Sequence, residues 1–319
     1  MNPTGPSPDS ASAAIDATVR RLIVRLQSLV EGESAISDLV ACGPPAIAPL
    51  RDFLLSGRIV SVPQPRVWAV DALALLGARD ALIEYLQSSG AAADAELQFA
   101  EDSVRNTAGR RLRAWRDNQT FEVLVEFSQK RNLPGIIETV AAFERPEAIP
   151  CLDRALEDDL CRSAAEEGLR RLGSAARGAL LISAVTPLPA ALEETPSSLC
   201  RRRSVMGLLA EIAISPHDWQ ELRPLLEEHD PELLVRLAQM AASAADQADR
   251  TRAAAALVNA LPTAPWFVWK DAELALVALA PQSLAPVAAE LDRRSSQPPL
   301  ARAADEVLRM LLRIKPRIS

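Results

Sequence analysis

Aromatic residues are scarce in this chain of 319 residues. Tryptophan, phenylalanine and tyrosine together make up 4% of it, whereas apolar residues make up 49%. The core must therefore consist mainly of Ala, Leu, Val and Ile, whose small side chains allow helices to pack closely. Long uncharged apolar runs are also missing, so the sequence predicts no membrane-spanning segment.

Lysine is almost absent. Of the 35 basic residues only Lys130, Lys270 and Lys315 are lysines, and the formal net charge of the chain is −7. General binding to nucleic acid or to an anionic membrane needs a strong basic field. The charge balance therefore disfavours both kinds of partner, although it allows a local basic patch.

Paired cysteine motifs are absent as well. The four cysteines contain no CxxC pair and lie inside apolar helical patterns: Cys42, Cys151, Cys161 and Cys200. Such cysteines are typical of buried free thiols rather than of a disulfide framework. They predict a reducing compartment, and we expect the protein to be cytoplasmic.

The sequence offers little for catalysis or metal binding. Its two histidines, His217 and His229, precede or begin predicted helices, and the cluster Glu227–Asp230 places its metal-binding residue types side by side. Consecutive residues point in different directions, whereas helical metal ligands are spaced three or four apart. No glycine-rich phosphate loop and no nucleophile–base pair is recognisable. We therefore expect no catalytic residue, cofactor or metal ion, and hence no enzyme.

Helical periodicity begins near residue 15. Residues 1–13 are rich in Pro and Ser and predict a disordered N-terminal tail. Ile15 and the apolar residues after it recur at steps of three and four, which favours a helix. The remaining chain alternates short helical patterns with breaks and shows no strand pattern. The first helices of successive two-helix hairpins are expected to begin about 33 residues apart, near Arg66, Glu101, Gly135, Asp159, Leu199, Pro231, Val268 and Pro299.

One segment shows the repeat most clearly. It contains a Pro-Glu-Ala-Ile-Pro-Cys-Leu helix (146–152), the acidic turn Glu157–Asp159, and an Arg-Ser-Ala-Ala-Glu-Glu-Gly-Leu-Arg-Arg-Leu-Gly helix (162–173). In this unit Ala164 and Ala165 would allow close packing, and Gly173 would end the helix in a left-handed turn. The segment resembles the HEAT-like repeats of the phycobilisome-lyase type, which are also found in many bacterial proteins of no known catalytic role. No chromophore-handling motif accompanies the match.

The resemblance implies an all-α fold. We expect a right-handed α–α superhelix, a HEAT-like solenoid of about eight helical hairpins, forming a single domain over residues 14–319. Hairpins of this kind bury their apolar faces only against neighbouring repeats.

Two groups of residues are candidates for partner binding. The first concentrates aromatic side chains beside a lysine: Trp266, Phe267, Trp269 and Lys270. Large rigid side chains dominate interface energetics, but burial of the cluster as a packing plug between repeats is the default interpretation. The second is Arg201, Arg202 and Arg203 at a helix start, where cations oppose the helix dipole. These arginines either pair with acids of the neighbouring repeat or meet an anionic partner.

The family association is with protein–protein contact, so the leading hypothesis is a non-catalytic scaffold that binds a protein or peptide on its concave face. The alternative is a DNA-interacting enzyme. Trp266, Trp269, Lys270 and Asp271 loosely resemble the Trp, basic and Asp residues with which HEAT-like alkylpurine DNA glycosylases hold damaged DNA. The acidic charge balance weighs against this alternative.

Overall fold

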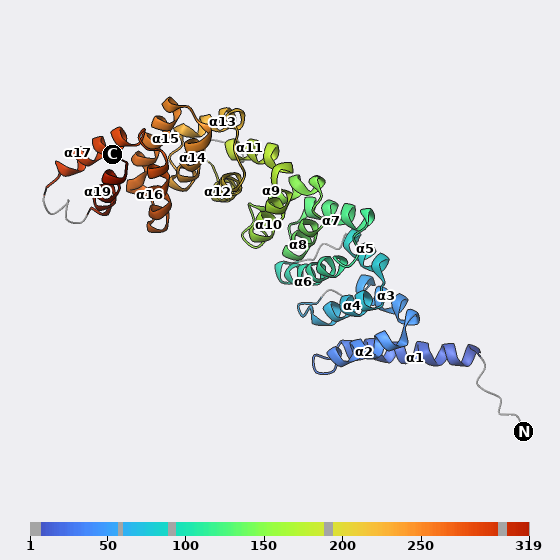
Figure 1. Ribbon diagram of the computed structural model, residues 1–319. Coiled ribbons are helices and arrows are strands. Elements are labelled where there is room, and N and C mark those ends of the chain that lie inside the picture. Colours follow the sequence, from blue (N-terminus) through green and yellow to red (C-terminus); the bar gives the residue numbers. More distant parts are fainter. Residues whose placement is uncertain (1–7, 57–59, 89–93, 188–193, 299–304, 319) are drawn as a thin grey trace, which may run out of the picture. The chain divides into compact units, whose positions relative to one another are not determined.

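The computed structural model describes residues 8–56, 60–88, 94–187, 194–298 and 305–318, with side chains from residue 14 onward. These residues form α-helices and short 3-10 helices and no strand, which confirms the all-α prediction (Figure 1). Their contacts fall into two compact units, Met1–Gly168 and Leu169–Ser319. The expectation of a single domain over residues 14–319 stays a prediction.

The first unit has two layers of helices (Figure 1). One layer contains α2 (Gly32–Cys42), α4 (Gln64–Leu75), α6 (Ala95–Leu112) and α8 (Pro134–Ala142). The other contains α1 (Pro8–Leu26), α3 (Ile47–Ser56), α5 (Arg79–Gln87), α7 (Asn118–Lys130) and α9 (Ile149–Ala155). Within each layer every helix packs on the next one in the series. The boundary between the units falls inside α10 (Arg162–Leu172).

The second unit repeats this arrangement. One layer contains α12 (Pro196–Glu211), α14 (Pro231–Ala244), α16 (Trp269–Ala278) and α19 (Glu306–Ile318), and the other contains α11 (Arg177–Val185), α13 (Pro216–Leu222), α15 (Gln247–Ala260) and α17 (Leu284–Ser295). Short 3-10 helices join them, η4 (Arg223–Glu227), η5 (Leu261–Thr263) and η6 (Trp266–Val268) among them. Each apolar stripe is thus buried by helices that are near in sequence.

The expected helix starts agree well with the observed ones. Those near Arg66, Gly135, Pro231 and Val268 fall within two residues of the starts of α4, α8, α14 and α16. The starts expected near Glu101, Asp159 and Leu199 belong to α6, α10 and α12, which begin at Ala95, Arg162 and Pro196 and are thus displaced by six, three and three residues. The last one, near Pro299, lies outside the described residues.

The N-terminal helix begins earlier than expected. Residues 1–7 of the expected tail lie outside the described residues, whereas residues 8–13 belong to α1. Val19, Leu22 and Leu26 are buried, as their spacing predicted. Leu29 is 62% exposed because α1 ends at Leu26 and Leu29 falls in the turn that follows.

Most residues of the repeat that resembles HEAT-like units behave as the packing argument requires, but Ala164 is only partly buried. Ala165 and Leu169 of α10 are fully buried. Gly168 lies so close to α8 that a Cβ there would be 2.7 Å from the Cβ of Ala141. Gly173 has φ +53°, a left-handed conformation that glycine adopts without strain. This repeat is therefore held by small residues at the helix contact.

Helix starts are fixed by local hydrogen bonds. The Asp230 carboxylate accepts a bond from the Leu233 amide at 3.0 Å at the start of α14. At the start of α13, Ser215 and Asp218 form a reciprocal capping box. Both motifs satisfy amides that have no partner within the helix.

Buried arginines bind the carbonyl ends of preceding helices. Arg66 of α4 donates to the Leu54 carbonyl at 2.7 Å, and Arg105 of α6 donates to the Ser88 carbonyl at 3.2 Å. Both guanidinium groups also pair with Glu101, which accepts a bond from the Tyr85 hydroxyl at 2.7 Å. Arginine suits this role because it stays charged and has five donors.

Candidate partner-binding surface

Two aromatic side chains are exposed immediately before α16. Trp266 is 79% exposed and Phe267 is 57% exposed, and both belong to η6. Their rings touch edge to face, with centroids 6.0 Å apart and an interplanar angle of 84°. This geometry is a favourable one for aromatic pairs and orders both rings at the surface. The exposure that the binding hypothesis needs is therefore present at these two residues, and the default expectation of burial between repeats is wrong for them.

The backbone turn that contains the aromatic pair is fixed by contacts of the two residues that follow the pair. Val268 is buried, and the indole Nε1 of Trp269 donates to the Ala264 carbonyl at 3.1 Å. Trp269 is only partly exposed, so this tryptophan mainly supports the turn. Lys270, one residue further, is exposed. The sequence-predicted cluster thus divides into an outward-facing group and one supporting residue.

The same face of α16 carries a residue that the sequence reasoning missed. Leu274 is 48% exposed and lies one turn after Lys270. Leu312 of α19, a helix that packs on α16, is 56% exposed. The sequence does not show whether a single leucine in an amphipathic helix is buried or exposed. Only the rotation of each helix about its own axis could have indicated that Leu274 and Leu312 are exposed.

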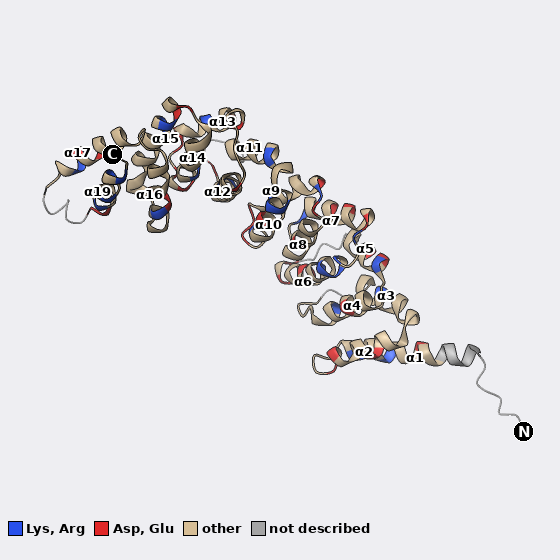
Figure 2. Ribbon diagram, viewed as in Figure 1, with Lys and Arg blue, Asp and Glu red and all other residues tan. Residues whose placement is uncertain are grey.

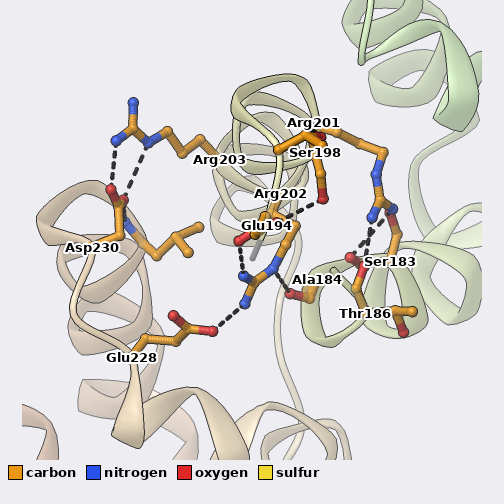
Figure 3. A network of polar contacts seen from close by, with 12 residues as sticks. Ser183, Ala184, Thr186, Glu194, Ser198, Arg201, Arg202, Arg203, Glu228 and Asp230 are labelled. Carbon is orange, nitrogen blue, oxygen red and sulfur yellow. Dashed lines mark hydrogen bonds and ion pairs between the residues drawn. The ribbon is translucent and has the colours of Figure 1, made fainter. Parts of the chain in front are cut away.

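Arg201 and Arg202 occupy a different environment, shown in Figure 3. Their exposed fractions are 2% and 1%, so neither is a surface contact for a partner. Arg202 donates to the Ala184 carbonyl at 2.8 Å, to Glu194 at 2.7 Å and to Glu228 at 2.5 Å. The assignment of these two arginines to partner binding is therefore corrected: they bind carbonyl and carboxylate groups within the second unit.

The neighbouring residues complete this network. Arg201 bonds to the hydroxyl of Ser183 and, at 2.5 Å, to the Thr186 carbonyl near the end of α11. Arg203 pairs with Asp230 at 2.5 Å (Figure 3). It also pairs with Glu232 at 2.8 Å, so both acids lie at the start of the next helix in its layer. Arg203 is less buried, with 32% of its side chain exposed. Of the two readings of this stretch, pairing with acids of the neighbouring repeat is the one observed for Arg202 and Arg203.

Other charged side chains are also interspersed and paired. Figure 2 shows both acidic and basic residues scattered over the helices of each unit. Arg110 forms a two-pronged pair with Glu138, both contacts at 3.0 Å, and Arg111 contacts Asp71 at 2.7 Å. These ion pairs join helices of one layer, so most of the arginine charge is locally balanced.

The DNA-enzyme alternative gains no support from the positions of its residues. Asp271 pairs with Arg236 at 3.2 Å, and the indole nitrogen of Trp269 is engaged by Ala264. Within the part of the chain that the structure describes, no three His, Cys, Asp or Glu side chains are grouped to hold a metal ion. His217 and His229 lie at the starts of α13 and α14, as expected from their turn sequences.

The cysteines are free thiols. Cys151 and Cys161 are buried, and the other two, Cys42 and Cys200, are partly exposed. Burial raises the pKa of the Cys151 thiol, and burial together with nearby Asp158 raises the pKa of Cys161 to about 12. Both buried thiols are therefore protonated near neutral pH and are poor nucleophiles.

Two further findings concern membrane-spanning helices and similarity to known proteins. Among the described residues, every helix is too short or too polar to cross a bilayer. No protein-family model and no curated protein matches this chain.

Proposed function

We propose that this chain is a non-catalytic scaffold, a HEAT-like solenoid of about eight hairpins wound as a right-handed superhelix, which binds a protein or peptide partner. The neighbour-to-neighbour packing of helices in two layers within each unit supports the repeat assignment. The free cysteines support a reducing, cytoplasmic location.

The observation that carries the binding proposal is the exposed aromatic pair. The chain contains few aromatic residues, yet Trp266 and Phe267 remain largely in contact with solvent. Tryptophan is among the residues most enriched at binding hot spots, because it buries a large area at a small cost in side-chain entropy. Val268 and Trp269 fix the turn that contains the pair. The backbone therefore needs little further ordering when a partner binds, which lowers the entropic cost of binding.

The test uses a double variant, Trp266→Ala with Phe267→Ala, in the full chain. We would capture partners from the native cell lysate, identify them by mass spectrometry, and measure the affinity of each purified partner for both proteins. The double variant should weaken binding by ~2 kcal/mol or more. Trp269→Ala is a less clean choice, because it also removes the bond to Ala264.

The matched control is Phe99→Ala. Phe99 is 73% exposed but lies on α6 of the first unit, so its substitution removes an exposed aromatic ring without touching the proposed surface. Circular dichroism should show the same helicity for all three proteins. Equal partner affinities for the wild type and the double variant would exclude this surface as the binding site.

A further inference from the structure

Most of the exposed large apolar side chains of the second unit lie on or next to α16 and α19, whereas Ile182 lies on α11. Among its described residues five large hydrophobic side chains are exposed: Ile182, Trp266, Phe267, Leu274 and Leu312. Phe267, Lys270 and Leu274 are spaced three and four residues apart along η6 and α16, so they share one side of that helix. Leu312 belongs to α19, which packs against α16.

The exposed stripe of α19 adjoins this face. Arg309, Leu312, Arg313 and Arg317 are exposed, and each lies three or four residues from another member of this set, whereas Leu311 and Ile314 are buried. Two residues of the stripe reach α16: Arg313 lies 3.5 Å from the Glu273 carboxylate, and Arg317 also pairs with it. The stripe of α19 and the face of α16 therefore form one continuous surface, which we call the α16–α19 surface (Phe267, Lys270, Leu274, Leu312, Arg313 and Arg317).

This surface has an excess of positive charge. Arg313 and Arg317 share the single carboxylate of Glu273. Lys270 forms no ion pair with any described residue, whereas the adjacent Asp271 is paired with Arg236. Two positive charges on this surface are thus left without a carboxylate of their own, in a chain whose formal net charge is −7.

We propose that the α16–α19 surface binds an acidic protein segment that carries aliphatic or aromatic side chains between its carboxylates. The proposal rests on the scaffold function above and specifies the partner's chemistry. Leu274 and Leu312 offer apolar area that a ligand must cover, and Lys270, Arg313 and Arg317 offer charges that carboxylates can complement. An amphipathic acidic segment satisfies both requirements at once.

Two other ligand classes fit the surface less well. A nucleic acid gains affinity mainly from phosphates that many cations neutralise, and it leaves exposed leucines uncovered. An anionic membrane presents an extended charged plane to the whole acidic chain, which repels it. A short peptide interacts mainly with charges within a Debye length, about 10 Å at 0.1 M salt, so it experiences the local excess.

The experiment measures fluorescence anisotropy of labelled synthetic peptides with the full-length protein. One peptide alternates Glu pairs with Leu and Phe, and a second replaces every Glu with Gln. At low salt the Glu peptide should bind at least about 10-fold tighter than the Gln peptide, and this advantage should shrink as salt is raised. Two further probes are a single-stranded oligonucleotide and vesicles containing phosphatidylserine.

The variants locate the binding. Lys270→Glu should weaken binding of the Glu peptide by about 5-fold or more, and Leu274→Ser should weaken binding of both peptides. Lys130→Glu is the matched control, because Lys130 is 74% exposed and lies on α7 of the first unit. This control should leave the affinity for the Glu peptide nearly unchanged. All positions are exposed, so the folds should survive, as dichroism would verify.

Several results would overturn the proposal: equal binding of the Glu and Gln peptides, an equal effect of Lys270→Glu and Lys130→Glu, or tighter binding of the oligonucleotide or the vesicles. The scaffold function is judged separately by the Trp266 and Phe267 variant. If that variant loses its captured partner while the Glu peptide does not bind, the scaffold stands and the acidic chemistry is wrong. If the Glu peptide binds through Lys270 while the variant keeps all partners, the peptide site is real but the aromatic pair is not the hot spot.

Discussion

Replacing Arg202 with methionine should reveal how strongly the arginine network holds the second unit together. Methionine keeps an unbranched apolar stem of about the length of the aliphatic part of arginine and remains compatible with burial, but it removes three charge-assisted hydrogen bonds. These bonds join the end of α11, the segment before α12 and the segment before α14, through Ala184, Glu194 and Glu228. The substitution therefore separates the loss of polar contacts from the loss of packing.

The structure sets the size of the effect. Removing one partner of a fully buried ion pair costs about 3–5 kcal/mol, because a charge is left without compensation. Here the side chains of Glu194 and Glu228 are 20% and 31% exposed, so water can solvate them after the substitution. The Ala184 carbonyl also loses its donor. We expect a loss of ~2–3 kcal/mol in the free energy of unfolding of this unit.

The neighbouring arginine is the matched control. Arg203 also pairs with two acids, but its side chain is 32% exposed, and exposed pairs contribute about 1 kcal/mol or less. Amide hydrogen exchange in α12 would report opening of this unit without assuming that the two units unfold together. If Arg203→Met destabilises α12 as much as Arg202→Met does, burial is not what gives the network its strength.

Two further predictions concern α10 and the thiols. Leu169→Asp should lower stability by at least ~3 kcal/mol, since it buries an unpaired carboxylate, whereas Leu160→Asp, at a side chain that is 78% exposed, should have little effect. Equal melting temperatures would contradict the packing assigned to α10. Mass spectrometry should find four free thiols, and alkylation near neutral pH should be slow at Cys151 and Cys161, where burial raises the thiol pKa. A native disulfide, or rapid labelling of either buried thiol, would contradict this.

Helix positions could be predicted because their signals are local. The start of α14 follows from three consecutive residues, Asp230, Pro231 and Glu232, and the observed bond from the Leu233 amide to Asp230 is the cap that this order implies. Likewise Gly173 ends its helix in the left-handed conformation that its position suggested. Such contacts join residues within one turn, so the sequence alone contains nearly all the relevant information.

The burial and the hydrogen-bond partners of Arg201, Arg202 and Arg203 depend on contacts with residues that are distant in sequence. On a helix, consecutive side chains diverge by about 100°, so the three arginines must face different surroundings. The Ala184 carbonyl is 18 positions before Arg202, and Glu228 is 26 positions after it. Only the packing of α11 and α14 around α12 brings these groups together. A run of three arginines therefore indicates a charged stretch of helix without telling which of the three is buried, and α12 begins at Pro196, so they lie in its second turn and not at its start as expected.

The exposure of the aromatic pair depends on the phase of a single 3-10 turn. In η6, Trp266 and Phe267 point outward while Val268 is buried, and Trp269 then folds back to Ala264. A shift of one residue would place a different ring at the surface, so composition and periodicity could not decide the matter. Leaving the Trp266 ring in solvent also forgoes most of the ~1.5–3 kcal/mol that burying a large apolar side chain provides. It follows that Trp266→Ala with Phe267→Ala should leave the melting temperature nearly unchanged. A large drop would mean that these rings stabilise the fold, and the argument for a binding role would lose its basis.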